Sequence, residues 1–99
     1  MKFLVTWRLH EDKRHEIFEA FSQMTPDDDE AQLDGMNLIG RWHDVPNGNG
    51  VIIIETDNQE NLTSWMMSWS SMCTFPIVKP VVDDQTGRKL VKELIASQS

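Results

Sequence analysis

The chain contains 99 residues, of which 39% are hydrophobic and 25% are charged, and its formal net charge at pH 7 is −7. This composition is typical of a single folded domain, and we take residues 1–99 as that domain. The negative charge argues against two classes of partner, nucleic acid and anionic membrane surfaces, because both attract basic proteins.

The sequence also argues against resident metals and export. Cys73 is the only cysteine, so neither an internal disulfide nor a cysteine-based metal site is expected. The three histidines lack the spacing of metal ligands. The first residues lack the apolar run of a signal peptide, and no stretch approaches the roughly 18 apolar residues of a membrane span. We therefore expect a cytoplasmic protein without a metal or other cofactor.

The first third of the chain predicts a strand and two helices. Residues 3–9 alternate with a period of two, so that Phe3, Val5, Trp7 and Leu9 share one face and Leu4, Thr6 and Arg8 share the other. Residues 11–24 follow a helical period, which ends at Thr25-Pro26 because a residue before proline leaves the α region. Thr25 can cap a second, short helix that Gly35 closes.

A β-hairpin and a helix follow. Residues 36–43 and 51–56 are predicted strands, and the Pro-Asn-Gly-Asn-Gly segment at 46–50 is a strong turn signal. Asp57 can cap the next helix, with Glu60 as its capping-box partner. The apolar stripe of that helix consists of Leu62, Trp65, Met66 and Trp69.

The last quarter of the chain predicts an edge strand and a terminal helix. Residues 75–82 have strand character, but Pro76 and Pro80 cannot donate to a ladder and so favour an edge position. Residues 83–86 lead into a helix with an apolar stripe. We expect the stripe to point inward; it consists of Leu90, Val91, Leu94 and Ile95.

This order predicts an α+β fold of the ferredoxin-like βαββαβ type, with a four-stranded antiparallel sheet, helices on one face and an additional C-terminal helix. The open face of such a sheet is normally polar. Here residues 51–54 read Val-Ile-Ile-Ile, and four more aliphatic residues lie between 77 and 82. We therefore expect a homodimer that packs through the sheet. The alternative is a monomer whose terminal helix crosses the open face.

Gly40-Arg41-Trp42-His43 is the most distinctive segment for chemistry. On a strand, Arg41 and His43 share one face, where a cation and an imidazole could bind an anion or a carbonyl group. Glu55 lies opposite Arg41 if the hairpin register permits. A structural polar ladder, with Arg41 paired to Glu55, is the alternative interpretation.

Tryptophan is the second chemical signal. The chain has four tryptophans and no tyrosine, and Trp65 and Trp69 lie one helical turn apart. They could form the wall of a pocket for a flat or hydrophobic ligand. Core packing accounts for the same pattern, because aromatic side chains dominate protein cores.

Several segments together resemble a family of short bacterial and bacteriophage proteins known as a domain of unknown function. They are Met-Lys-Phe-Leu-Val-Thr-Trp at the start, Gly-Arg-Trp-His at 40–43, Glu-Thr-Asp at 55–57 and the helix with Trp65 and Trp69. That family is similar in fold to the dimeric α/β-barrel superfamily, which includes cofactor-independent monooxygenases and haem-degrading relatives. The resemblance implies the fold and the dimer, and it implies no established activity.

The monooxygenases place Asn, Trp and His or Arg around a hydrophobic pocket, and Trp65 with His43 or Arg41 resembles that set. Strand one has Thr6 and Trp7 in place of that asparagine, which departs from the monooxygenase set. Thr6 is one of the candidate ligand-binding residues.

Two functional hypotheses follow. In the first, the protein is a dimer that binds a small hydrophobic or anionic molecule, with Thr6, Glu55, Trp65 and Trp69 as ligand-binding residues. An enzymatic form of this hypothesis makes His43 the acid–base group and Arg41 the stabiliser of an oxyanion. In the second, the protein is a non-catalytic interaction or regulatory module with an acidic surface. An open pocket between sheet and helices favours the first, and a filled core beneath Trp65 favours the second.

Overall fold

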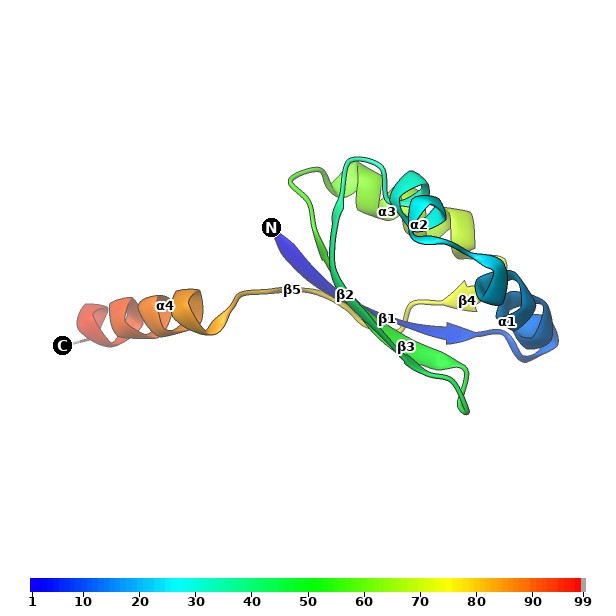
Figure 1. Ribbon diagram of the computed structural model, residues 1–99. Helices are drawn as coiled ribbons and strands as arrows, with labels where there is room; N and C mark the ends of the chain where they lie inside the picture. The colour runs from blue at the N-terminus through cyan, green and yellow to red at the C-terminus, as the bar shows by residue number, and fades with distance from the viewer. Residues whose placement is uncertain (99) are drawn as a thin grey trace.

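The computed structural model describes residues 1–98, which form an antiparallel sheet with three helices on one face and a fourth helix that projects away from it (Figure 1). The strands are β1 (Lys2–Leu9), β2 (Asn37–Asp44), β3 (Asn49–Glu55), β4 (Cys73–Thr74) and β5 (Val78–Val81). The helices are α1 (Arg14–Gln23), which follows the 3₁₀ turn η1 (Glu11–Lys13), α2 (Pro26–Gln32), α3 (Gln59–Trp69) and α4 (Asp84–Ser97). The predicted α+β class is confirmed.

The strands lie in the order β2-β3-β1, and β4 and β5 both pair with the free side of β1. The strand predicted at 75–82 is shorter than expected, Val78–Val81, and a separate two-residue strand, Cys73–Thr74, precedes it. Pro76 lies in the gap, where the Ile77 amide donates to Oγ1 of Thr6 (3.1 Å) instead of to a backbone carbonyl. Thr6 therefore holds the segment after Pro76 twice, through its hydroxyl and through its backbone amide, which donates to the Ile77 carbonyl at 2.9 Å.

Local signals set most of the element boundaries. Thr25 and Asp28 form a reciprocal capping box at the start of α2, and Gly35 after that helix has φ +78°. The predicted cap of α3 is off by one residue: the side chain of Asn58 accepts from the Glu60 amide (2.9 Å). Asp57 instead pairs with the N-terminal ammonium group (3.2 Å).

The core lies between the sheet and the helices. Its buried centre consists of Val5, Leu33, Ile52, Ile54 and Leu62. In β1 the odd-numbered residues face this core, and in β3 the even-numbered ones do, because Val5 is paired with Ile52. The opposite face of the sheet, which we call the outer face, carries Leu4, Val51 and Ile53, which are partly exposed, and Trp42, which is 59% exposed.

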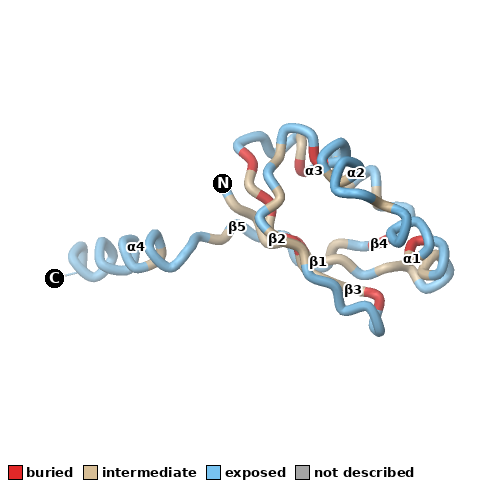
Figure 2. Tube along the Cα trace, in the orientation of Figure 1, coloured by how far each residue is buried: buried red, intermediate tan, exposed pale blue. Residues whose placement is uncertain are grey.

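The terminal helix does not pack as the sequence suggested. Leu90, Val91, Leu94 and Ile95 were expected to point inward, but they are 49–61% exposed. Helix α4 continues outward from β5, and it is exposed along most of its length (Figure 2). The expected stripe exists, but the chain's own sheet does not cover it. No helix within residues 1–98 is long and apolar enough to cross a membrane.

Candidate functional site

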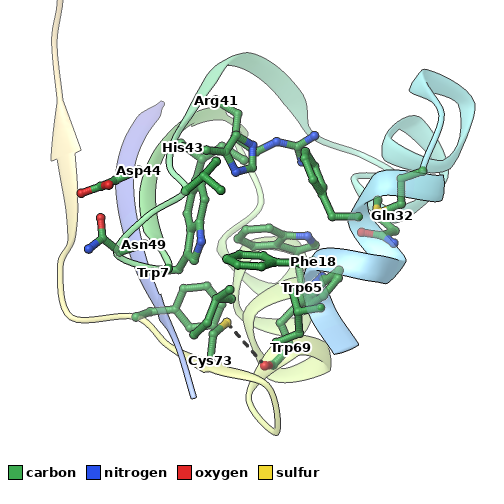
Figure 3. A pocket seen from close by; sticks show the side chains of 18 residues that line it. Trp7, Phe18, Gln32, Arg41, His43, Asp44, Asn49, Trp65, Trp69 and Cys73 are labelled. Carbon is green, nitrogen blue, oxygen red and sulfur yellow. Dashed lines mark hydrogen bonds between the residues drawn. The ribbon is translucent and has the colours of Figure 1, made fainter. Parts of the chain in front are cut away.

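A cavity of about 310 Å³ lies between the core face of the sheet and the helices. Six aromatic side chains line it, and they come from β1, α1, α3 and the segment after β4 (Figure 3). These residues are Trp7, Phe18, Phe21, Trp65, Trp69 and Phe75. The volume is at the lower end of the range for small-molecule sites, and the mainly apolar wall is typical of them.

The sequence builds this wall through simple periodicities. Trp7 belongs to the core-facing set of β1, and Trp65 and Trp69 are one turn apart on α3. Gly50, paired with Trp7 across the sheet, leaves the space that the indole ring occupies. A Cβ atom at Gly50 would collide with that ring and with the backbone oxygen of Trp42.

His43 is the imidazole of the site, and it points toward the aromatic wall (Figure 3). Its ring lies 4.6 Å from that of Phe21 and 5.2 Å from that of Trp7, between centroids. Its ring nitrogens make no hydrogen bond to any residue within 1–98. Partial burial and the positive charge of Arg41 lower the pKa of His43, although Asp29 acts in the opposite sense. The neutral ring is therefore the main form at neutral pH, and it offers one donor and one acceptor.

Arg41 lies beside His43 on β2, but its charge is already paired. Its Nη2 donates to Oδ2 of Asp29 in α2 at 2.9 Å, and the guanidinium stacks over Phe21 at 5.5 Å from the ring centroid. The side chains of Arg41 and Asp29 are only 20% and 22% exposed. The pair thus holds α2 against the sheet at the edge of the cavity. It also neutralises Arg41, which the sequence had suggested as a group for binding an anion.

A second arginine joins α1 to the hairpin turn. Arg14 donates to the backbone carbonyls of Val45 (3.4 Å) and Pro46, and its guanidinium lies 5.5 Å from the ring centroid of Phe18. Gly48, at φ +67°, passes directly under this side chain. Because Val45, Gly48 and Phe18 all line the cavity, this contact fixes one side of its opening.

The structure brings together four of the six candidate site residues. His43, Arg41, Trp65 and Trp69 all line the cavity. Thr6 and Glu55 do not, and this corrects their expected location. Thr6 belongs to the even-numbered set of β1, on the outer face, where its hydroxyl accepts from the Ile77 amide.

The hairpin register explains the position of Glu55. Arg41 is paired with Ile52, and Glu55 is paired with Asn37 at the far end of β2. Glu55 is also paired with Lys2 of β1, again on the outer face. The Arg41–Glu55 pair of the polar-ladder interpretation therefore does not form, and the carboxylate that Arg41 does meet comes from α2.

Sequence reasoning missed several lining residues and the partner of Arg41. Phe18 and Phe21 lie within residues 11–24, whose helical period was recognised, and Trp7 was in the alternating set of β1 that faces the core, so a signal existed for each. Asp29 had no distinctive signal, because it sits in an acidic run that is also explained by favourable charge at a helix start.

Fold and cavity together define an α+β protein with an aromatic-lined site between sheet and helices, an unpaired imidazole in its wall and a neutralised arginine beside it. Residues 1–98 hold no group of three His, Cys, Asp or Glu side chains that could bind a metal ion. The chain belongs to the DUF3303 family, whose profile, described as a domain of unknown function, matches residues 1–95. The expected membership in such a family is confirmed. Comparison with curated proteins and with solved structures gave no match.

Proposed function

We propose that this protein binds an uncharged, mainly aromatic small molecule in the cavity and holds its polar substituent by a hydrogen bond to His43. The observation that carries the proposal is the combination of six aromatic lining residues with one imidazole that has no hydrogen-bond partner within residues 1–98. Apolar pockets with a few well-placed polar groups are the usual form of a ligand site.

The charge state of the wall favours an uncharged ligand over an anion. Asp29 neutralises Arg41, and partial burial together with the charge of Arg41 lowers the pKa of His43, which favours its uncharged form. An anion would have to displace the Asp29 carboxylate or protonate His43, and either step reduces the free energy gained on binding. Of the hydrophobic and anionic ligands considered from the sequence, the geometry supports the hydrophobic one.

The proposal includes a homodimer of ferredoxin-like subunits that pack through their sheets. The strand order β2-β3-β1, with β4 and β5 on the other side of β1, supports a ferredoxin-like core. The partly exposed Leu4, Val51 and Ile53 and the exposed Trp42 on the outer face support burial against a second sheet. The cavity is on the opposite face, so dimerisation leaves it accessible.

Isothermal titration calorimetry with three related probes tests the ligand site. Naphthalene supplies only the aromatic surface, 2-naphthol adds an uncharged hydroxyl group, and 2-naphthoate adds a negative charge. We expect saturable one-site binding, with 2-naphthol bound most tightly and 2-naphthoate most weakly. No heat from any of the three, or tightest binding of the anion, would contradict the proposal.

Matched variants locate the binding. His43→Phe should keep naphthalene binding and remove the advantage of 2-naphthol, about five- to tenfold in Kd for one hydrogen bond of about 1 kcal/mol. Trp65→Ala should weaken all three probes. Trp42→Ala, which removes an indole from the outer face, should leave the Kd values unchanged. Equal losses in the two tryptophan variants would place binding outside the cavity.

A further inference from the structure

Helix α4 presents an apolar stripe to solvent at the end of an extended arm. Leu90, Val91 and Leu94 are 49%, 54% and 57% exposed, and the helix lies clear of the sheet and of the other helices (Figure 1). A 14-residue helix in isolation is marginal in water, since most helical stability in proteins comes from packing of the apolar face. The stripe thus requires a covering surface.

The start of α4 directs the helix away from its own sheet. Strand β5 pairs with β1 up to Val81, so the chain leaves the sheet in a defined direction. The side chain of Asp83 then caps α4 by accepting from the Thr86 amide at 2.8 Å, and its other oxygen lies 3.8 Å from Nζ of Lys2. Folding α4 back over its own sheet would require these contacts to break or reorganise.

The size of the molecule also indicates a missing partner. A compact chain of 99 residues has a radius of gyration of about 13 Å, whereas this chain has 16.3 Å and a longest extent of 56 Å. Its accessible surface is 7174 Å², which exceeds the expectation for a folded monomer of 11.5 kDa by about 1,400 Å². A standard interface removes about 800 Å² from each partner, so the excess is sufficient for a stable dimer.

Charge distinguishes the arm from the rest of the chain. Helix α4 carries three basic and two acidic side chains, whereas the rest of the sequence carries six basic and fourteen acidic ones. Two strongly acidic bodies repel each other, and a slightly basic arm laid on the opposite body reduces that repulsion. Within residues 1–98, Lys89 and Lys92 have no acidic partner, so both remain available to a second copy.

From these observations we propose that two copies of this chain exchange their α4 arms, each arm packing its apolar stripe on the outer face of the other copy's sheet. The receiving surface consists of Leu4, Trp42, Val51 and Ile53. This inference rests on the proposed homodimer but changes its packing, because the partner's α4 arm, and not the partner's sheet, covers these residues. The exchange would bury the two apolar surfaces that a single chain leaves partly exposed.

Sedimentation equilibrium of the full chain at micromolar concentration provides the first test. We expect the mass of two chains for the wild type and for Gln85→Glu, and the mass of one chain for Leu94→Asp. Gln85→Glu lowers the charge by the same amount at an exposed position on the polar side of α4, so it is the matched control. The near-UV circular dichroism of Trp7, Trp65 and Trp69 should be preserved in both variants, because α4 does not contribute to the core; only the contribution of Trp42 should change in Leu94→Asp.

The outcomes separate the two proposals. A wild type of one-chain mass would overturn both the homodimer and the exchange. A Leu94→Asp variant that keeps the mass of two chains would overturn only the exchange, and the sheet-to-sheet dimer would stand.

Cross-linking identifies what the arm touches. Leu94→Cys and Ile53→Cys chains are mixed, allowed to re-equilibrate and treated with a short bismaleimide. Cys73 should not interfere, because burial raises the pKa of its thiol to about 11. We expect a covalent heterodimer of the two variants. A product only between two Leu94→Cys chains would overturn the exchange. So would a link within a single chain that carries both Leu94→Cys and Ile53→Cys.

Discussion

The ion pair between Arg41 and Asp29 gives the sharpest test of the site, because it holds α2 against the sheet. Exposed pairs contribute about 0–1 kcal/mol, and breaking a buried pair costs about 3–5 kcal/mol. With side chains about four-fifths buried and an Nη2–Oδ2 distance of 2.9 Å, this pair falls between those limits. Oδ1 of Asp29 is buried and has no partner within residues 1–98, so losing Arg41 would leave the whole carboxylate poorly compensated.

We therefore expect Arg41→Met to lower the free energy of unfolding by about 2 kcal/mol. For a domain of this size such a loss lowers Tm by roughly 8–16 °C. Asp29→Leu should also destabilise the fold, because it leaves the guanidinium unpaired. The double variant should be more stable than the sum of the two losses predicts, because no charge then remains in the partly desolvated site.

Chemical denaturation of the four proteins gives the coupling energy between the two side chains. Arg88→Met is the matched control: its pair with Asp84 is 3.7 Å long with side chains 69% and 94% exposed, so we expect a change below about 0.5 kcal/mol. A coupling energy for Arg41 and Asp29 below about 0.5 kcal/mol would refute the reasoning. So would equal effects of Arg41→Met and Arg88→Met.

Three further predictions follow from the same geometry. By NMR titration His43 should have a pKa below 6.5, and Arg41→Met should raise it, because a repelling charge is lost while a carboxylate remains. Since the folded-state pKa is the lower one, the contribution of His43 to stability should be present above pH 6.5 and lost as the pH falls through the folded-state pKa. Gly50→Ala should cost about 1–3 kcal/mol and weaken 2-naphthol binding, whereas Gly40→Ala need only displace an exposed indole and should cost less. Cys73 should resist a thiol reagent at pH 8 until the chain unfolds, because it is 5% exposed and burial raises its pKa to about 11; rapid labelling of the native protein would contradict this.

Elements governed by local chemistry could be predicted from the sequence. The capping box at Thr25, the hairpin turn and the alternation of β1 each depend on contacts within a few residues, and each is present, although the turn predicted at 46–50 lies at 45–48. The strand predicted at 75–82 begins only at Val78, because the Ile77 amide donates to the side chain of Thr6 and not to a backbone carbonyl. These two residues are 71 positions apart. Nothing within the segment itself specifies that bond.

The site shows the same division between local and distant information. Period-two alternation placed Arg41 and His43 on one face of a strand, and that prediction agrees with their shared position in the cavity wall. The partner of Arg41 depended on hairpin register and on the position of α2. A bulge between Leu38 and Gly40 shifts the register, so Ile52 is opposite Arg41 and Glu55 is three residues further along β3. The available carboxylate then comes from Asp29, and the expected anion site becomes a neutral one.

The position of α4 shows how a correct periodicity can give a wrong packing prediction. The spacing of apolar residues identifies the side of the helix that packs away from water. It does not say whether the surface that this side packs against belongs to the same chain or to another. For residues 62–69 the cover is the chain's own sheet, because α3 lies across the core face. For α4 the short connection from β5 removes that choice, and the same kind of stripe becomes a surface for a second molecule. A sequence pattern that leaves both a sheet face and a helix stripe uncovered therefore favours exchange between chains over either surface acting alone.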